Sequence, residues 1–201
     1  MTTVVFDVGN VLLRWDARRV YRDVLDTDAE IDAFFDRVNF VAWNLAQDAG
    51  RSWADGVAEA SANHPQDAAL IQRFDREWHL SIPGPIEGSV DVLATLKEAG
   101  VPLYAITNFS AEKWAECQTR FPFLADSFLG VVVSAHEKLV KPDPAIFMLF
   151  LDRYGQRAED CIFIDDSPAN IASAQALGFD ALLFDTAPAL AADLRARGLP
   201  V

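Results

Sequence analysis

The sequence predicts an α/β fold in which a doubly wound parallel sheet carries a helical insertion. Past residue 84, short apolar runs alternate with amphipathic stretches, a pattern typical of repeated βα units on a parallel sheet. From about residue 17 to residue 82 the apolar residues follow helical spacing, and no convincing period-two strand appears. With 201 residues, 51% of them hydrophobic and 23% charged, the chain can bury a sizeable core.

Five short apolar runs are the expected strands of the sheet. They are Val4–Val8, Leu103–Thr107, Leu129–Val133, Cys161–Asp165 and Ala181–Phe184. Amphipathic stretches between these strands are the expected helices, and a last helix is expected after the fifth strand. These helices lie near residues 89–99, 111–119, 145–154, 169–177 and 188–197.

Residues with capping chemistry mark the ends of these helices. Short polar side chains accept the free N–H groups at a helix start, and proline suits the first helical position. Glycine favours the left-handed conformation that closes a helix. The expected N-caps are Ser89, Ser110, Asp143 and Ser167, with Pro144 and Pro168 following two of them, and the expected closing glycines are Gly100, Gly155, Gly178 and Gly198.

The insertion between strand one and the rest of the sheet is expected to be helical. Ser52, with Asp55 three residues later, resembles a capping box that opens one of its helices. The run Pro83-Gly84-Pro85 marks the return to the sheet, because proline prevents a continuing helix and glycine lets the chain turn. We therefore divide the chain into a Rossmann-like core of residues 1–16 and 84–201 and a helical domain of residues 17–83.

Composition and charge exclude several classes of partner. Lys and Arg number 17 against 30 Asp and Glu, a net charge of −13, which provides no electrostatic footprint for nucleic acid. The longest apolar run, Ile146 to Leu151, is far shorter than the roughly 20 residues that cross a bilayer. The start of the chain, up to Asp7, lacks the basic region of a signal peptide. We expect a cytoplasmic protein, a monomer or homodimer, that acts on a small molecule.

Polar side chains follow the expected strands at the points where those strands end. In an open parallel sheet, ligands bind outside the carboxyl ends of the strands, so side chains that are distant in sequence converge there. The expected group comprises Asp7 at the end of strand one, Thr107 and Asn108 at the end of strand two, Asp165 and Asp166 at the end of strand four, and Lys141 between the second and fourth strands.

This group of residue types suits phosphoryl transfer. A carboxylate can attack phosphorus and form an acyl phosphate that water then hydrolyses. Several carboxylates near one point repel each other, and a hard divalent cation with oxygen ligands holds them together. A lysine and the free N–H groups at nearby helix starts complement the charge of the phosphoryl group.

The sequence resembles the haloacid dehalogenase superfamily of hydrolases, whose four motifs are present in order. They are Phe6-Asp7-Val8-Gly9-Asn10-Val11, Ile106-Thr107-Asn108, Val140-Lys141-Pro142 and Ile164-Asp165-Asp166. The match covers nearly the whole chain. The resemblance implies that the helical insertion is a type 1 cap on a Rossmann-like core.

The resemblance also implies a role for each residue of the group. Asp7 would be the nucleophile, Thr107 and Asn108 would hold the transferred group, and Lys141 would steady its charge. Mg²⁺ would be held by Asp7, the Gly9 carbonyl and Asp166, with Asp165 supporting the metal. Arg14, which leads into the cap, is a further candidate for substrate contact.

The sequence departs from the phosphatases of this superfamily at Gly9. Those enzymes usually carry there, two residues after the nucleophile, a second aspartate that acts as general acid and base. Its loss would cost about 10²–10⁴-fold in rate if nothing replaced it, and the nearby Asn10 and Arg14 are poor acids. A branch with Phe-Asp-x-Gly-Asn-Val at strand one is similar and includes sugar-phosphate phosphatases.

The expected activity is Mg²⁺-dependent hydrolysis of a small phosphorylated metabolite, such as a sugar phosphate, through an aspartyl-phosphate. A 2-haloacid dehalogenase is the first alternative, because a halide leaves without a proton and the missing acid would do no harm. A catalytically silent binding protein is the second alternative. Metal dependence separates the first alternative from a phosphatase, and turnover of any phosphate ester excludes the second.

Overall fold

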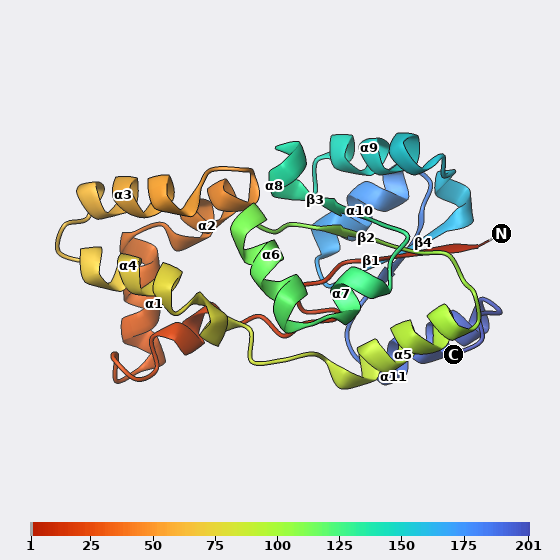
Figure 1. Cartoon of the computed structure of the whole chain (residues 1–201), viewed down its shortest axis with the longest axis horizontal. Coiled ribbons are helices and arrows are strands. Elements are labelled where there is room, and N and C mark those ends of the chain that lie inside the picture. Colours follow the sequence, from red (N-terminus) through yellow and green to blue (C-terminus); the bar gives the residue numbers. More distant parts are fainter. Residues whose placement is uncertain (1) are drawn as a thin grey trace.

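The computed structural model describes residues 2–201 and contains one five-stranded parallel sheet (Figure 1). The strand order is β3-β2-β1-β4-β5, and every neighbouring pair is parallel. The strands are β1 (Thr3–Phe6), β2 (Leu103–Thr107), β3 (Gly130–Val133), β4 (Cys161–Asp165) and β5 (Asp180–Leu183). This sheet and the helices around it confirm the predicted α/β class.

The central strand β1 determines where a ligand site can form. It pairs with β2 through Val4 and Leu103, and with β4 through Val5 and Phe163. The chain builds outward from β1 to β3 on one side, then crosses back and builds from β4 to β5 on the other. The strand order thus reverses between β1 and β4, and the carboxyl ends of these two strands border the crevice in which such sheets bind ligands.

Helices cover both faces of the sheet. Helices α5 (Glu87–Glu98) and α11 (Ala187–Ala196) pack together on one face, and α9 (Pro144–Tyr154) and α10 (Pro168–Ala176) pack on the other (Figure 1). Successive residues of β1 therefore enter two different apolar clusters. Val4 lies in the cluster on the α5 side, and Val5 lies in the one on the α9 side. The remaining elements of the sheet region are α6 (Ala111–Arg120), α7 (Phe123–Asp126), α8 (Ser134–Glu137) and the 3₁₀ helix η3 (Ala158–Asp160).

One expected helix start is wrong. Helix α5 begins at Glu87 with Ile86 as its N-cap, so Ser89 lies inside the first turn, where its side chain is buried. The Ile86 N–H donates to the Leu12 carbonyl at 2.8 Å, and this bond sets where the chain enters the helix. The other three expected N-caps are at the predicted positions, although only Asp143 accepts an N–H with its side chain. All four expected closing glycines have positive φ, for example +60° at Gly155 after α9.

Between β1 and α5 the chain forms a group of helices at the end of the molecule opposite the N-terminus (Figure 1). We call this the helical segment. It comprises η1 (Ala17–Val20), α1 (Asp28–Arg37), α2 (Phe40–Asp48), α3 (Trp53–Asn63), α4 (Ala68–Arg76) and η2 (Trp78–Ser81). Ser52 caps α3 by accepting the Asp55 N–H, as predicted. The complete capping box of this segment is at Thr27 and Glu30, which open α1.

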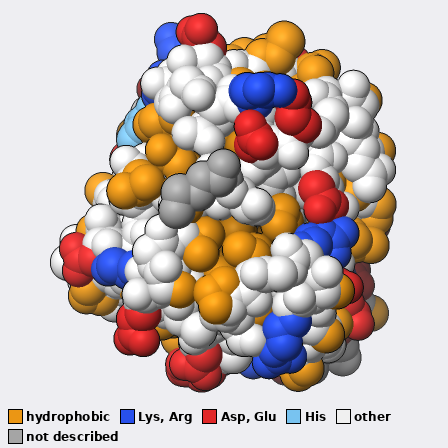
Figure 2. Space-filling view, turned by 90° about the vertical axis from the view of Figure 1, so that its right-hand side faces the viewer, with side chains coloured by type: hydrophobic (Ala, Val, Ile, Leu, Met, Phe, Trp, Pro, Cys, Tyr) orange, Lys and Arg blue, Asp and Glu red, His pale blue; other side chains and the backbone are white. Residues whose placement is uncertain are grey.

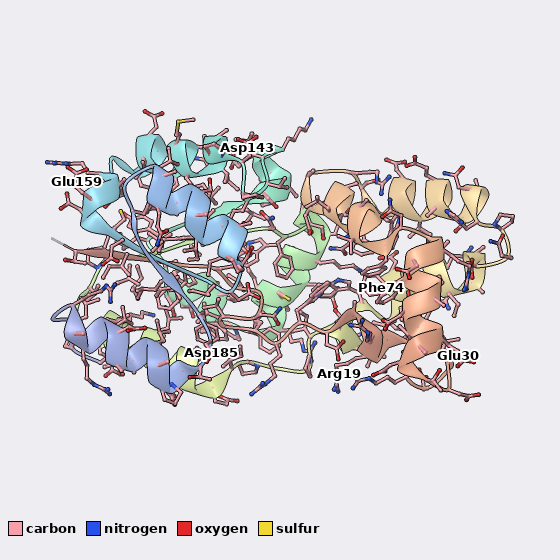
Figure 3. The ribbon with its side chains drawn as sticks, turned by 180° about the vertical axis from the view of Figure 1, so that it is seen from behind. Arg19, Glu30, Phe74, Asp143, Glu159 and Asp185 are labelled. Carbon is pink, nitrogen blue, oxygen red and sulfur yellow. The ribbon has the colours of Figure 1, made fainter. Side chains whose placement is uncertain are left out.

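An aromatic cluster holds the helical segment together. Phe74, on α4, is fully buried and lies among the helices (Figure 3). Its ring centroid lies 4.8 Å from that of Phe40 and 5.8 Å from those of both Trp43 and Trp53. Because these rings come from three different helices, this contact joins α2, α3 and α4 into one unit.

The amino-terminal end of the sheet carries no concentration of one charge. Figure 2 looks onto this end and shows acidic and basic side chains interspersed, with hydrophobic side chains between them. None of the helices in residues 2–201 is both long and apolar enough to span a membrane.

Replacing Phe74 with alanine should destabilise the protein strongly. Removal of a fully buried ring at the centre of the aromatic cluster should lower the free energy of unfolding by about 3–5 kcal/mol. The matched control is Val41→Ala on α2, where the side chain is 79% exposed and the expected change is within about 0.5 kcal/mol. Urea denaturation followed by circular dichroism measures both, and equal midpoints would show that the cluster does not stabilise the fold.

Candidate functional site

A buried lysine joins the ends of the two strands that border the crevice. Asp7 follows β1 directly, and Asp165 is the last residue of β4. The Nζ of Lys141, from the loop before α9, lies 2.8 Å from Asp7 Oδ1 and 2.6 Å from Asp165 Oδ2. All three side chains are buried. The structure therefore brings together three of the residues predicted from widely separated parts of the sequence.

Asn108 fixes the main chain of Lys141. The Lys141 N–H donates to Asn108 Oδ1 at 2.8 Å, and Asn108 Nδ2 donates to the Lys141 carbonyl at 2.9 Å. The side-chain amide thus pairs with both the N–H and the carbonyl of Lys141, in the way that a residue of a neighbouring strand would. Both ends of the Asn108 side chain are engaged in this way, which makes it a positioning group for Lys141.

Asp165 is held by donors on several sides. Besides Lys141, its carboxylate accepts the Ser167 N–H at 2.8 Å and Asn170 Nδ2 at 2.9 and 3.0 Å. Asn170 is buried, so this contact is shielded from water. Since both carboxylate oxygens already have partners within the protein, the main task of Asp165 is to hold the Lys141 ammonium in place.

Asp166 is the exposed acid of the group. Carboxylate oxygens of Asp7, Asp165 and Asp166 all lie within 4.8 Å of one another, close enough to share a metal ion. Asn10 orients Asp166 through a side-chain hydrogen bond, and its Oδ1 accepts the Trp15 N–H at 3.0 Å. Asn10 has a φ of +53°, a left-handed conformation that asparagine adopts more readily than most residues.

Burial and crowding shift the pKa values of the group. Burial raises the pKa of Asp7 to about 7, with the charge of Asp165 adding to the rise and Lys141 opposing it. Burial disfavours the charged form of Lys141, but the two carboxylates beside it outweigh this effect and raise its pKa. The pKa of Asp166 is raised by burial and by Asp165. Three carboxylates thus face one ammonium, which leaves an excess of negative charge.

The donor set fits Mg²⁺. A hard divalent cation prefers carboxylate and carbonyl oxygens, and it would offset the excess negative charge of this group. The oxygens of Asp165 are already engaged by several donors, whereas Asp166 is exposed and Asp7 is bonded only by Lys141 and the Val8 N–H among the described residues. Asp7 and Asp166 are therefore the side chains that could hold the ion.

Thr107 contributes a hydroxyl without a partner. The residue is 1% exposed at the end of β2, and among the described residues its Oγ1 is one of three buried side-chain atoms that make no hydrogen bond. An unpartnered buried hydroxyl is costly unless a ligand completes it. Its position before Asn108 suits contact with an anionic group bound near Lys141.

A cavity of about 160 Å³ lies between the helical segment and the carboxyl ends of the strands. Its lining includes Gly9 and Asn108, which border the group of charged side chains. The full set is Gly9, Asn10, Trp15, Asn44, Asp48, Trp53, Trp78, Ile82, Asn108, Phe109 and Ser110. Arg14 is not among them. It is exposed and lines a neighbouring, more open hollow with Arg19 and Asp185.

Asp48, at the C-terminus of α2, is the cavity residue that the sequence analysis missed. Its side chain accepts Asn44 Nδ2 at 3.1 Å, and its pKa is raised to about 7, chiefly by burial and further by the charge of Asp7, while the Ser110 N–H opposes the rise. No motif marks Asp48, because only the packing of α2 against the sheet brings it to the cavity.

The chain matches a family model and a relative of known name over most of its length. The family model described as haloacid dehalogenase-like hydrolase matches residues 1–178. A sesquiterpene phosphatase of Aspergillus oryzae is 25% identical over 191 residues, which cover 95% of this chain and 93% of that protein.

Two solved structures share the fold. A haloacid dehalogenase family enzyme of Bacteroides thetaiotaomicron, in complex with magnesium and inorganic phosphate, superposes with a TM-score of 0.75 at 21% identity, covering 92% of this chain and 95% of that one. The L-2-haloacid dehalogenase of Xanthobacter autotrophicus superposes with a TM-score of 0.63 at 18% identity, covering 99% of this chain and 84% of that one. At these identities the two structures establish the fold alone.

Removing the charge of Asp165 should destabilise the protein far more than removing that of its neighbour. Asp165→Asn deprives the buried Lys141 ammonium of one partner and should lower the free energy of unfolding by about 3–5 kcal/mol. Asp166→Asn, the matched control at an exposed position, should change it by no more than about 0.5 kcal/mol. Urea denaturation in excess EDTA compares the two without a contribution from bound metal. Equal losses would mean that Asp165 does not hold the lysine.

Proposed function

Because the chain belongs to the haloacid dehalogenase-like hydrolase family, we propose that it hydrolyses a phosphate monoester in a Mg²⁺-dependent reaction through an aspartyl-phosphate on Asp7. The observation that carries this proposal is the contact of Asp7 with the buried Lys141 ammonium at 2.8 Å, beside the open carboxylate of Asp166. We also propose that residues 17–83 form a cap over a core of residues 1–16 and 84–201.

The excess of carboxylates favours a phosphatase over a dehalogenase. A dehalogenase that works without metal has no cation to offset the charge of Asp166 beside Asp7. A phosphatase uses that charge to bind Mg²⁺. The relatives point the same way: the Aspergillus oryzae protein is named a phosphatase, and the Bacteroides thetaiotaomicron enzyme binds magnesium and inorganic phosphate.

Each residue of the group has a place in the proposed reaction. Asp7 attacks phosphorus, the bond to the leaving oxygen breaks, and water then hydrolyses the acyl phosphate and restores the Asp7 carboxylate. Lys141 neutralises charge on the phosphoryl oxygens, and the Thr107 hydroxyl donates to one of them. Asn108 and Asp165 keep Lys141 in position. Asp7, Asp166 and the Gly9 carbonyl would hold Mg²⁺, which offsets charge on the phosphoryl group when bound.

The proposed substrate is a small phosphorylated metabolite. The cavity beside Asp7 has a volume of about 160 Å³, which limits the organic part of the ester. Its walls include Trp15, Trp53 and Trp78, which make part of the lining apolar and suit a compact organic group. Sugar phosphates are therefore one group in the substrate panel, beside other small phosphate esters.

Replacing Asp7 with asparagine should abolish turnover while it preserves shape. An amide cannot form the acyl phosphate, so hydrolysis of para-nitrophenyl phosphate should fall by about 10³-fold or more. Mass spectrometry of the intact protein excludes deamidation back to aspartate. Turnover at the wild-type rate by a verified Asp7→Asn protein would rule out Asp7 as the nucleophile.

Removal of divalent metal should abolish the same activity. Excess EDTA should eliminate hydrolysis of phosphate esters and added Mg²⁺ should restore it, while Asp166→Ala should raise the Mg²⁺ concentration needed for half-maximal activity. Release of halide from a 2-haloacid in EDTA would instead identify a dehalogenase. A protein that converts neither class of compound would be a binding protein.

A further inference from the structure

The proposed reaction requires a proton for the leaving group. An alkoxide is a poor leaving group from phosphorus unless an acid protonates it, and Gly9 offers no side chain for that purpose. We propose that Asp48, from the helical segment, donates this proton across the cavity. This inference rests on the proposed phosphatase function and adds to it a catalytic residue that no motif of the sequence marks.

The position of Asp48 in the cavity carries the inference. Within residues 2–201, Asp48 is the only ionisable side chain among the residues that line this cavity. Gly9 and Asn108, from the carboxyl ends of β1 and β2, line the same cavity. A phosphate ester bound at Asp7 with its organic part in the cavity would direct its bridging oxygen towards the space that Asp48 lines.

Hydrogen bonds tie the end of α2 to the sheet region. Ser134 Oγ donates to the Asp48 carbonyl at 2.6 Å and accepts the Phe109 N–H at 2.9 Å. Trp53, which opens α3 a few residues later, donates its Nε1–H to Ser110 Oγ at 2.7 Å. Asp48 is thus held against the residues that follow β2, even though it belongs to the helical segment.

The surroundings of Asp48 suit an acid that must hold and release a proton. Its carboxyl group is half-buried and accepts a hydrogen bond from Asn44 at 3.1 Å, and within the described part of the chain it contacts no lysine or arginine that would keep it ionised. Burial and the charge of Asp7 keep its pKa near neutrality. An acid with a pKa near the working pH is the most effective proton donor.

The proposed proton transfers balance over the whole reaction. As Asp7 forms its bond to phosphorus, the bond from phosphorus to the leaving oxygen breaks, and that oxygen takes the proton of the Asp48 carboxylic acid to leave as an alcohol. The Asp48 carboxylate then accepts a proton from the water that attacks the acyl phosphate. Inorganic phosphate leaves, and both aspartates return to their starting states.

Gly9 offers a way to restore the family's own acid. A Cβ added at Gly9 meets no atom within 4 Å, and its φ lies outside the left-handed region, so the backbone there accepts a side chain. The variant Gly9→Asp therefore supplies an independent proton donor two residues after Asp7. It can replace Asp48 only if the function of Asp48 is to supply a proton.

The test compares two esters of similar size in single-turnover experiments with Mg²⁺. Para-nitrophenyl phosphate releases an aryl oxide, which needs little protonation, and benzyl phosphate releases an alkoxide, which needs an acid. Asp48→Asn keeps the size of the side chain and one acceptor oxygen but cannot donate a carboxylic proton. We expect it to slow cleavage of benzyl phosphate by about 10²–10⁴-fold and that of para-nitrophenyl phosphate by less than about tenfold.

Rescue and control variants separate proton donation from a structural role. The double variant Gly9→Asp/Asp48→Asn should recover most of the lost benzyl phosphate cleavage. Asp36→Asn, at an exposed acid of the same segment outside the cavity, should leave both rates at the wild-type level. Asp48→Ser replaces the asparagine variant if that protein fails to fold, as judged by circular dichroism.

Each outcome bears on one claim. Equal slowing of both esters by Asp48→Asn, or no slowing of either, would overturn the role of Asp48 and leave the proposed phosphatase function standing. Failure of the Gly9→Asp double variant to recover the benzyl ester, when that variant is folded and cleaves the aryl ester, would also overturn it. If the wild-type protein cleaves neither ester nor any other phosphate ester, both proposals are wrong.

Discussion

The rest of the site depends on the burial of the Lys141 ammonium between two carboxylates. A charged amine that is removed from water is stable only when opposite charges lie within hydrogen-bonding distance, so Asp7 and Asp165 must both approach it. This requirement fixes the ends of β1 and β4 relative to the loop before α9. Asn108 then holds the lysine from the main-chain side, and Asn170 holds Asp165.

The same group of side chains carries more negative than positive charge, and this excess favours the binding of a cation. One ammonium cannot neutralise three carboxylates, and the raised pKa values of Asp7 and Asp166 result from burial and from this crowding. In the proposed function, Mg²⁺ would offset the excess negative charge of the carboxylates. An anionic phosphoryl group could then lie beside Asp7 without strong repulsion.

The sequence predicts the sheet well because each strand is a continuous apolar run, and strand ends mark where polar residues converge. The sequence predicts less well the helix starts and side-chain contacts that depend on residues far away in the chain. Ser89 has the chemistry of an N-cap, but a backbone bond at Ile86 starts α5 earlier. The motifs predict that Lys141 lies near Asp7, and the structure brings the two side chains into contact. The pairing of Asn108 with the Lys141 backbone could not be predicted, because it is a long-range contact that motif order does not encode.

Asp48 is the clearest example of a residue whose place in the site depends on long-range packing and could not be predicted from the sequence. Its position also has a mechanistic consequence. In this family the acid normally stands on the same loop as the nucleophile, so the sheet alone positions both. Here the proposed acid stands on α2, and the bonds of Ser134 and Trp53 to neighbouring residues hold it over the site. Protonation of the leaving group then requires the helical segment to be seated on the sheet, which makes chemistry conditional on a closed cavity. A substrate whose organic part fits the cavity of about 160 Å³ and still allows this seating meets its proton donor, and a larger one does not.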